Sequence, residues 1–161
     1  MRTSLFSTAL AGLTPFGAAG DTFPPFEIAR TWLVEMANGN TTLLFTVHDP
    51  SKLTNATQEC LGSWKTDSSD YPSSVYQPCS GNGAFAWRLD SFTGSNDFVI
   101  GLEHSFEDDE MGPYPYDYVD NYGSATFNSS NLYCENFDGN VTCGQVPGRF
   151  VKAPITRTAA K

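Results

Sequence analysis

The sequence predicts an all-β protein, a single-domain antiparallel β-barrel or sandwich with two disulfides. Several short segments alternate between apolar and polar residues, which is the period of a half-buried strand. Turn-forming pairs such as Asn38-Gly39 and Asp138-Gly139 separate some of these segments. No segment of useful length after residue 20 shows a helical period. At 161 residues and 40% hydrophobic content, the chain is long enough for one domain with a core.

The N-terminus has the features of a secretory signal peptide in their usual order. Arg2 is the positive start, residues 5–13 form a short apolar stretch, and the small residues 17–20 offer a cleavage site. We therefore expect cleavage near residue 20. The predicted parts of the chain are the signal peptide 1–20, the β-domain 21–155 and a flexible tail 156–161.

Cysteines and glycosylation sequons support an extracellular location. The chain has four cysteines, Cys60, Cys79, Cys134 and Cys143, and sequons at Asn40, Asn55, Asn128 and Asn140. An even cysteine count behind an export signal predicts two disulfides and leaves no cysteine for a covalent dimer. The sequons predict a glycoprotein of a eukaryotic secretory pathway.

The first two strands are predicted to form a hairpin. Residues 26–36 and 41–48 both alternate, and Asn38-Gly39 between them is a preferred pair for a two-residue turn. This turn places Trp32 opposite Phe45, so that apolar side chains meet on one face.

The same register divides the side chains of this hairpin between two faces. Phe26, Ile28 and Trp32 share the apolar face, whereas Asn40 and His48 fall on the opposite face. We interpret His48 as a solvated histidine, because no other metal-ligating residue type sits at strand spacing beside it.

The middle of the chain combines a long connection with two further strands. Residues 49–80 are rich in Ser, Thr, Asp and Pro and read as an irregular segment with Trp64 as its apolar anchor. Residues 84–90 and 98–106 alternate as strands. His104 ends the apolar stripe of the second strand, which predicts a core or rim histidine with one hydrogen-bond partner.

A C-terminal hairpin selects the disulfide pairing. The strands expected here are residues 131–137, 140–146 and 149–155. Counting back from the turn at 138–139 makes Cys134 and Cys143 a non-hydrogen-bonded pair on one face. Their spacing suits a disulfide, which leaves Cys60 to pair with Cys79.

Residues 107–122 form an acidic segment threaded with tyrosines and lacking Lys and Arg. One interpretation is a solvated acidic loop that runs into a strand. The other is a tyrosine-rich surface that contacts a partner. The candidate partner-binding residues are Tyr114, Tyr116, Tyr118, Asp117 and Asp120. The spacing of an EF-hand calcium loop is absent, and we predict no metal site.

Charge and missing motifs narrow the functional classes. A formal net charge of −9 argues against a nucleic-acid binder and against binding to anionic membranes. No apolar run reaches the ~20 residues of a membrane span. The motifs of a nucleophile elbow, a phosphate loop and a zinc protease are absent. We therefore predict no catalytic residue and no cofactor.

Several short stretches between residues 27 and 155 carry a family resemblance. They are the strand around Trp32, Thr57-Gln58-Glu59-Cys60, Trp64, Tyr76-Gln77-Pro78-Cys79, residues 98–106, Leu132-Tyr133-Cys134 and Cys143-Gly144-Gln145. In these the chain resembles the small secreted fungal proteins typified by the major allergen of Alternaria. The resemblance implies a β-barrel with the same two disulfides, no enzymatic activity, and an allergen or a protein that elicits or suppresses plant defence.

Three functional hypotheses follow. The first is a secreted effector or allergen-like protein that binds a plant extracellular protein or a cell-wall glycan through residues 107–122. The alternative is a carbohydrate-binding module, because tyrosine and tryptophan faces stack on sugar rings while carboxylates accept sugar hydroxyls. The third is a small hydrolase that uses carboxylates with His104 as a helper.

Overall fold

The computed structural model describes residues 23–110, 112–115 and 117–160, and every regular element in these ranges is a β-strand. The strands are β1 Phe26–Glu35, β2 Asn40–His48, β3 Thr57–Lys65, β4 Gln77–Pro78, β5 Phe85–Gly94, β6 Asp97–Glu107, β7 Tyr118–Phe127, β8 Leu132–Phe137, β9 Asn140–Gln145, β10 Val151–Ala153 and β11 Ile155–Ala160. The signal peptide expected at 1–20 lies outside the described residues. The described ranges contain no helix that could cross a membrane.

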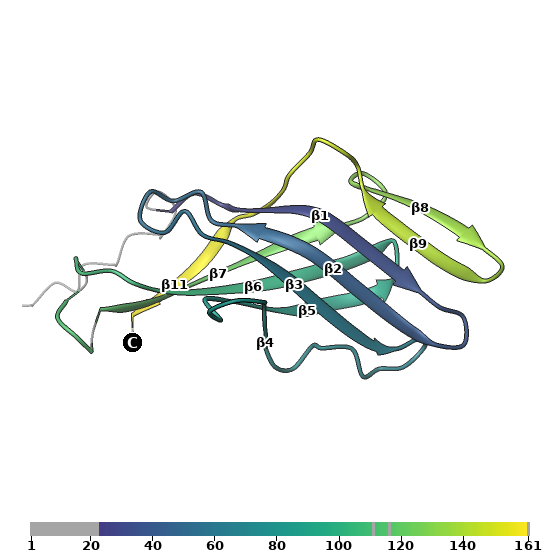
Figure 1. Cartoon of the computed structure of the whole chain (residues 1–161), viewed down its shortest axis with the longest axis horizontal. Coiled ribbons are helices and arrows are strands. Elements are labelled where there is room, and N and C mark those ends of the chain that lie inside the picture. The colour runs from purple at the N-terminus through teal and green to yellow at the C-terminus, as the bar shows by residue number, and fades with distance from the viewer. Residues whose placement is uncertain (1–22, 111, 116, 161) are drawn as a thin grey trace, which may run out of the picture.

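The strands form two antiparallel sheets. Sheet A has the order β3-β2-β1-β9-β8, with β10 also paired to β1, and sheet B has the order β11-β7-β6-β5-β4. In Figure 1, β1 to β3 lie in front of β5 to β7, and the β8–β9 hairpin extends toward one end of the molecule. No strand pairing among the described residues joins the two sheets into a closed barrel, so the sandwich alternative fits.

The core lies between the inner faces of the sheets. Its largest fully buried side chains are Trp87, Phe26, Phe45, Phe85, Phe98, Phe127, Ile28, Leu33, Leu43, Leu89, Ile100 and Leu102. Phe45 of sheet A meets Trp87 of sheet B edge to face, with ring centres 5.5 Å apart. Edge-to-face packing adds to the free energy gained from burying these rings. The apolar stripes predicted for 84–90 and 98–106 are confirmed.

A β-bulge in β1 overturns the predicted faces of the first strand from Trp32 onward, whereas Phe26 and Ile28 are buried as predicted. Ala29 pairs with Thr46 and Trp32 with Leu44, so β1 holds one more residue than β2 between these pairs. Arg30 sits in this bulge with φ of 54°. The extra residue reverses the alternation beyond it. Trp32 is consequently 49% exposed, instead of facing the core as predicted.

The turn after β1 is also different from the prediction. The Met36 N–H donates to the Asn40 carbonyl over 3.3 Å, and Gly39 donates to the Met36 carbonyl over 3.0 Å. Three residues, 37–39, therefore lie between the paired positions, and Trp32 pairs with Leu44 rather than with Phe45. Asn40 consequently lies on the same outer face as Trp32.

Two segments predicted to be irregular contain strands. Within 49–80, β3 pairs with β2 along its whole length, and Trp64 is buried as expected. Residues 156–160, expected as a flexible tail, belong to β11, which pairs with β7. Pro154 separates β10 of sheet A from β11 of sheet B, so the chain passes from one sheet to the other at this residue.

The disulfide pairing and the C-terminal hairpin are confirmed. Cys134 is paired with Cys143 in the predicted register, and Phe137 with Asn140 beside the turn. Gly139 has φ of 80°, the left-handed conformation that the turn needs. The second disulfide joins Cys60 to Cys79.

Candidate functional site

The predicted partner-binding residues do not share one exposed surface. Tyr114 is 80% exposed and Tyr118 is 37% exposed, whereas Tyr116 lies outside the described residues. Asp117 and Asp120 are buried, at 8% and 1% exposure. Asp120 accepts a hydrogen bond from the Ser105 hydroxyl over 2.6 Å. The two aspartates therefore belong to the packed end of sheet B, which corrects their placement on a contact surface.

The histidines occupy the two predicted environments. His48 lies on the outer face of β2, with Nδ1 2.8 Å from the Thr57 hydroxyl oxygen. His104 is buried at 1% exposure, and its Nδ1 lies 3.0 Å from Asp49 Oδ2. Its ring stacks on Phe85 with centres 3.9 Å apart. In the hydrolase hypothesis this ring would have to reach a substrate, and its burial against Phe85 instead favours a structural role for His104.

Asp49 links the β2–β3 connection to sheet B through His104. Burial raises the pKa of the Asp49 carboxyl. Hydrogen bonds from His104, from the Thr54 hydroxyl and from the Ser51 N–H outweigh this effect and lower the pKa to about 2. The carboxylate is therefore the form that the fold requires.

Acidification should weaken the fold through Asp49. The pKa of Asp49 is about 2 in the folded chain, against 3.8 for a free aspartate. Because folding lowers this pKa, the carboxylate stabilises the protein above about pH 4, and this stability is lost as the pH falls toward 2. The loss amounts to about 2 kcal/mol. We expect urea unfolding of Asp49→Asn to show that much less pH dependence between about pH 6 and about pH 2. An equal pH dependence in both proteins would contradict this role.

The outer face of sheet B is occupied by contacts among its own side chains. The Arg88 guanidinium lies 4.7 Å from the Tyr76 ring centre, and that of Arg157 lies 3.8 Å from the Tyr122 ring centre. Arg88 also pairs with Asp90 over 2.7 Å. These cation–π and ionic contacts engage the charged groups within the protein.

The outer face of sheet A carries a row of apolar side chains that crosses five strands, which we call the Trp32 row. Its members are Leu61 of β3, Leu44 of β2, Trp32 of β1, Gly144 of β9 and Tyr133 of β8, each paired with the next in the strand register. Leu61 is 61% exposed and Tyr133 is 66% exposed, beside the half-exposed Trp32. Large apolar side chains gathered on one exposed face mark a contact surface more often than scattered ones do.

Gly144 shapes the centre of the Trp32 row. A Cβ at this position would lie 3.2 Å from Cζ3 of Trp32 and 3.3 Å from its Cε3. The indole therefore lies over the glycine, toward Tyr133. Because these two aromatic residues are two strands apart, their backbones are separated by about 10 Å. The row thus offers two aromatic rings, and the indole covers the glycine that lies between their two strands.

Polar residues border the Trp32 row on the same face. The next register positions toward the β1–β2 turn are Ser63, Thr42, Val34, Thr142 and Glu135. The Thr42 and Ser63 hydroxyls lie 3.2 Å apart across β2 and β3. Hydroxyl and carboxylate groups thus stand one register step from the aromatic rings, where they can bond to a ligand that lies on the row.

Two sequons lie toward one end of this outer face. Asn40 is exposed at the start of β2, and Asn140 starts β9, where its Oδ1 accepts a hydrogen bond from the Ala37 N–H over 2.9 Å. Asn55 and Asn128 lie in connections between strands. Glycans at Asn40 and Asn140 would stand near the row without replacing any of its members.

Sequence reasoning missed the Trp32 row because it assigned Trp32 to the core. Both Trp32 and Leu33 are apolar, so composition alone does not choose which of them faces inward. Arg30 is the one local sign of the bulge in the sequence, because its charged side chain interrupts the apolar face assigned to this strand. A charged residue within an apolar stripe is one sign of a bulge that reverses the faces beyond it.

Comparison with known proteins gives no further guide to this surface. No protein-family model matches the chain, and no curated protein matches it significantly.

Proposed function

We propose that this chain is a secreted, disulfide-bonded protein that binds a cell-wall polysaccharide through the Trp32 row. The observation that carries the proposal is the alignment of Trp32 and Tyr133 on one exposed sheet face with Gly144 between them. Aromatic rings offer flat apolar faces to the C–H groups of sugar rings. The backbones of the two residues are about 10 Å apart and the indole lies over Gly144 between them, so both rings can contact one extended sugar chain.

The polar border supports a polysaccharide over a purely apolar partner. Sugar rings present C–H groups on their faces and hydroxyls at their edges, so a matching surface needs both kinds of contact. Thr42, Thr142 and Glu135 supply hydroxyl and carboxylate groups beside the aromatic rings. The arrangement extends across the sheet, as a chain-like ligand requires.

An extracellular setting agrees with the covalent features of the chain. Both disulfides suit an oxidising compartment, and the signal peptide expected at residues 1–20 and the four sequons point to the secretory route. The resemblance to secreted fungal proteins typified by the Alternaria major allergen adds a setting at the surface between fungus and plant. Such a protein would act by binding, as an effector or as a component of the wall.

Removing the indole should abolish most of the binding. We expect Trp32→Ala to bind an insoluble β-glucan or chitin preparation about 30-fold more weakly, since a central aromatic contact is worth about 2 kcal/mol. The side chain is half exposed, so the unfolding free energy should change little. Binding isotherms on washed polysaccharide, with circular dichroism for the fold, measure both effects.

Tyr114→Ala is the matched control, because this exposed aromatic residue lies in the acidic segment and not on sheet A. It should retain full binding. If Tyr114→Ala lost binding while Trp32→Ala kept it, the acidic segment would be the contact surface and this proposal would be wrong. Absence of binding to any wall polysaccharide, with recovery of a single plant protein, would favour the effector hypothesis instead.

A further inference from the structure

A hollow lies where β1 changes its partner strand. β1 pairs with β10 through Phe26–Ile28 and with β9 through Trp32–Glu35, and the bulge falls between the two. Beside it, the connection 146–150 leaves a half-open space of about 450 Å³. Its walls are mostly apolar, and the volume falls in the range of small-molecule sites.

Gln145 holds the walls of this hollow in place. Its Oε1 accepts a hydrogen bond from the Thr31 N–H over 3.1 Å, and its Nε2 donates to the Ile28 carbonyl over 3.0 Å. The same Nε2 donates to the Arg149 carbonyl over 2.6 Å. One side chain therefore joins both sides of the bulge to the 146–150 connection. The hollow is thus formed in advance of any ligand.

Two guanidinium groups face no acidic partner here. Arg30 and Arg149 both line the hollow and both are exposed. Within the described ranges, neither side chain makes an ion pair, a hydrogen bond or a cation–π contact. The chain has 18 acidic residues against nine Lys and Arg, so two unpaired arginines in one hollow are a local exception. Arginine binds carboxylates through paired parallel hydrogen bonds.

Arg30 occupies a backbone conformation that suits glycine better. Its φ of 54° lies in the left-handed region, where an L side chain is crowded. A bulge alone is satisfied by glycine at this position. Strained residues gather at functional sites, and here the strained residue contributes one of the two cations. Residue 30 is therefore an arginine at a position where the backbone conformation alone would favour glycine.

We propose that this hollow binds a small amphipathic carboxylic acid, with an aromatic or medium-length aliphatic body. The apolar body would lie against Ala29 and the half-exposed Phe150, while the carboxylate bonds to Arg30 and Arg149. The site is separate from the polysaccharide surface proposed above, and neither proposal depends on the other.

Three probes separate the contributions of charge and apolar body. Isothermal titration calorimetry of the disulfide-bonded protein would use trans-cinnamate, cinnamyl alcohol and galacturonate. The alcohol has the apolar body without the charge, and galacturonate has the charge without the apolar body. We expect cinnamate to bind at least about tenfold more tightly than either, because the alcohol lacks the charge-assisted hydrogen bonds and galacturonate lacks the apolar surface to bury. Equal binding of either control probe, or no binding of cinnamate, would overturn the proposal.

Arg30→Gly tests the site without weakening the fold. The glycine relieves the crowded conformation, so the melting temperature should stay equal or rise, while cinnamate affinity falls at least about tenfold. Arg149→Gln should lower affinity by a similar factor. Lys52→Gln removes one positive charge at an exposed position outside the hollow and should leave affinity unchanged. Unchanged affinity in both arginine variants, or an equal loss in Lys52→Gln, would overturn the proposal.

Discussion

Gly62→Ala is expected to destabilise the protein by about 3 kcal/mol, although it adds only one methyl group. Gly62 lies in β3, and a Cβ there would stand 2.4 Å from Cζ2 and 2.6 Å from Cη2 of Trp87. Trp87 is fully buried between the sheets, so its ring has no free space to enter. Either β3 moves outward or the indole leaves its rotamer, and both disturb the core. Urea unfolding measures the loss.

A smaller ring should reverse part of this effect. In the Gly62→Ala background, Trp87→Phe removes the atoms that clash, so the double variant should lose at least about 1 kcal/mol less than the sum of the two single variants. Gly94→Ala is the matched control, because the nearest atom to its Cβ is 3.7 Å away. It should change stability by less than about 0.5 kcal/mol. Additive losses in the double variant would show that the indole contact is not the cause.

Local alternation and turn chemistry were sufficient to predict much of sheet B and the C-terminal hairpin. The apolar residues of β6 and of the first half of β5 recur at every second position, and the irregularities of β5 begin only after Leu89. In the β8–β9 hairpin, the Asp138-Gly139 turn sets the register, so the Cys134–Cys143 pairing follows from counting residues. These inferences need only neighbours in the chain.

The Trp32 row could not be predicted in the same way, because its exposure depends on one extra residue in β1. Strand alternation has a period of two, so a single inserted residue moves every later side chain to the other face. The bulge at Arg30 is stabilised by Gln145, whose hydrogen bonds to Thr31 and Ile28 span 114 and 117 residues of the chain. No local pattern reports such a contact. The position of Trp32 therefore follows from long-range structure.

Long-range contacts also explain why the sequence predictions were wrong for β11 and for Asp120 of β7. Residues 156–160 lack a strong apolar pattern and are strand only because β7 supplies their hydrogen-bond partners. Asp120 was assigned to an exposed surface from the acidity of its neighbours, yet it is buried beside Ser105. A run of charged residues predicts solvent exposure on average. Whether one aspartate of the run is buried depends on the hydrogen-bond partners that the tertiary fold places beside it.

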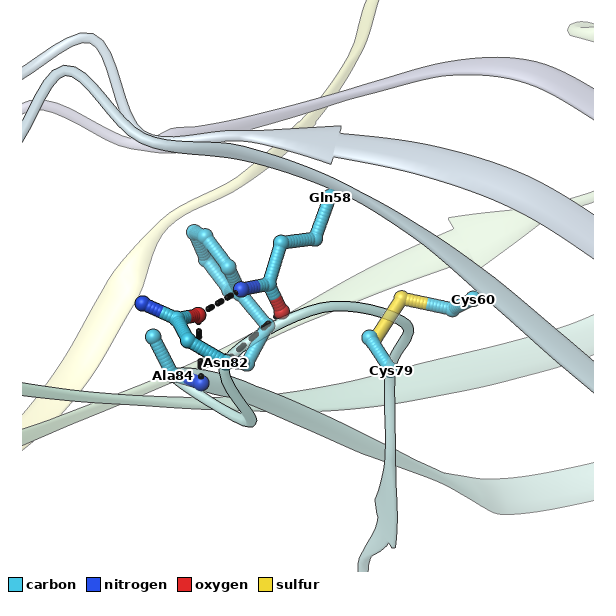
Figure 2. The surroundings of a disulfide bond; sticks show 6 residues. Gln58, Cys60, Cys79, Asn82 and Ala84 are labelled. Carbon is cyan, nitrogen blue, oxygen red and sulfur yellow. Dashed lines mark hydrogen bonds between the residues drawn. A yellow bond between two sulfur atoms is a disulfide. The ribbon is translucent and has the colours of Figure 1, made fainter.

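The disulfide Cys60–Cys79 joins residues only 19 positions apart in the sequence, yet it connects the two sheets of the sandwich. Cys60 belongs to β3, an edge strand of sheet A, and Cys79 follows β4, an edge strand of sheet B. The bond therefore joins the edges of the two sheets. Figure 2 shows Gln58 beside it, hydrogen-bonded to Asn82 and, through its Oε1, to the Phe85 N–H over 3.2 Å. Covalent and hydrogen bonds thus close the same side of the sandwich.

Replacing Cys60 and Cys79 with alanine should lower the free energy of unfolding by about 3 kcal/mol. The unfolded chain gains entropy because the 19-residue loop is no longer closed. The Cys134–Cys143 bond lies within one hairpin, so its removal should mainly loosen β8 and β9. Hydrogen exchange distinguishes the two cases. Without Cys60–Cys79, protection should fall along both β3 and β5, whereas without Cys134–Cys143 it should fall in the hairpin alone. Equal protection along β5 in both variants would show that the bond does not hold the two sheets together.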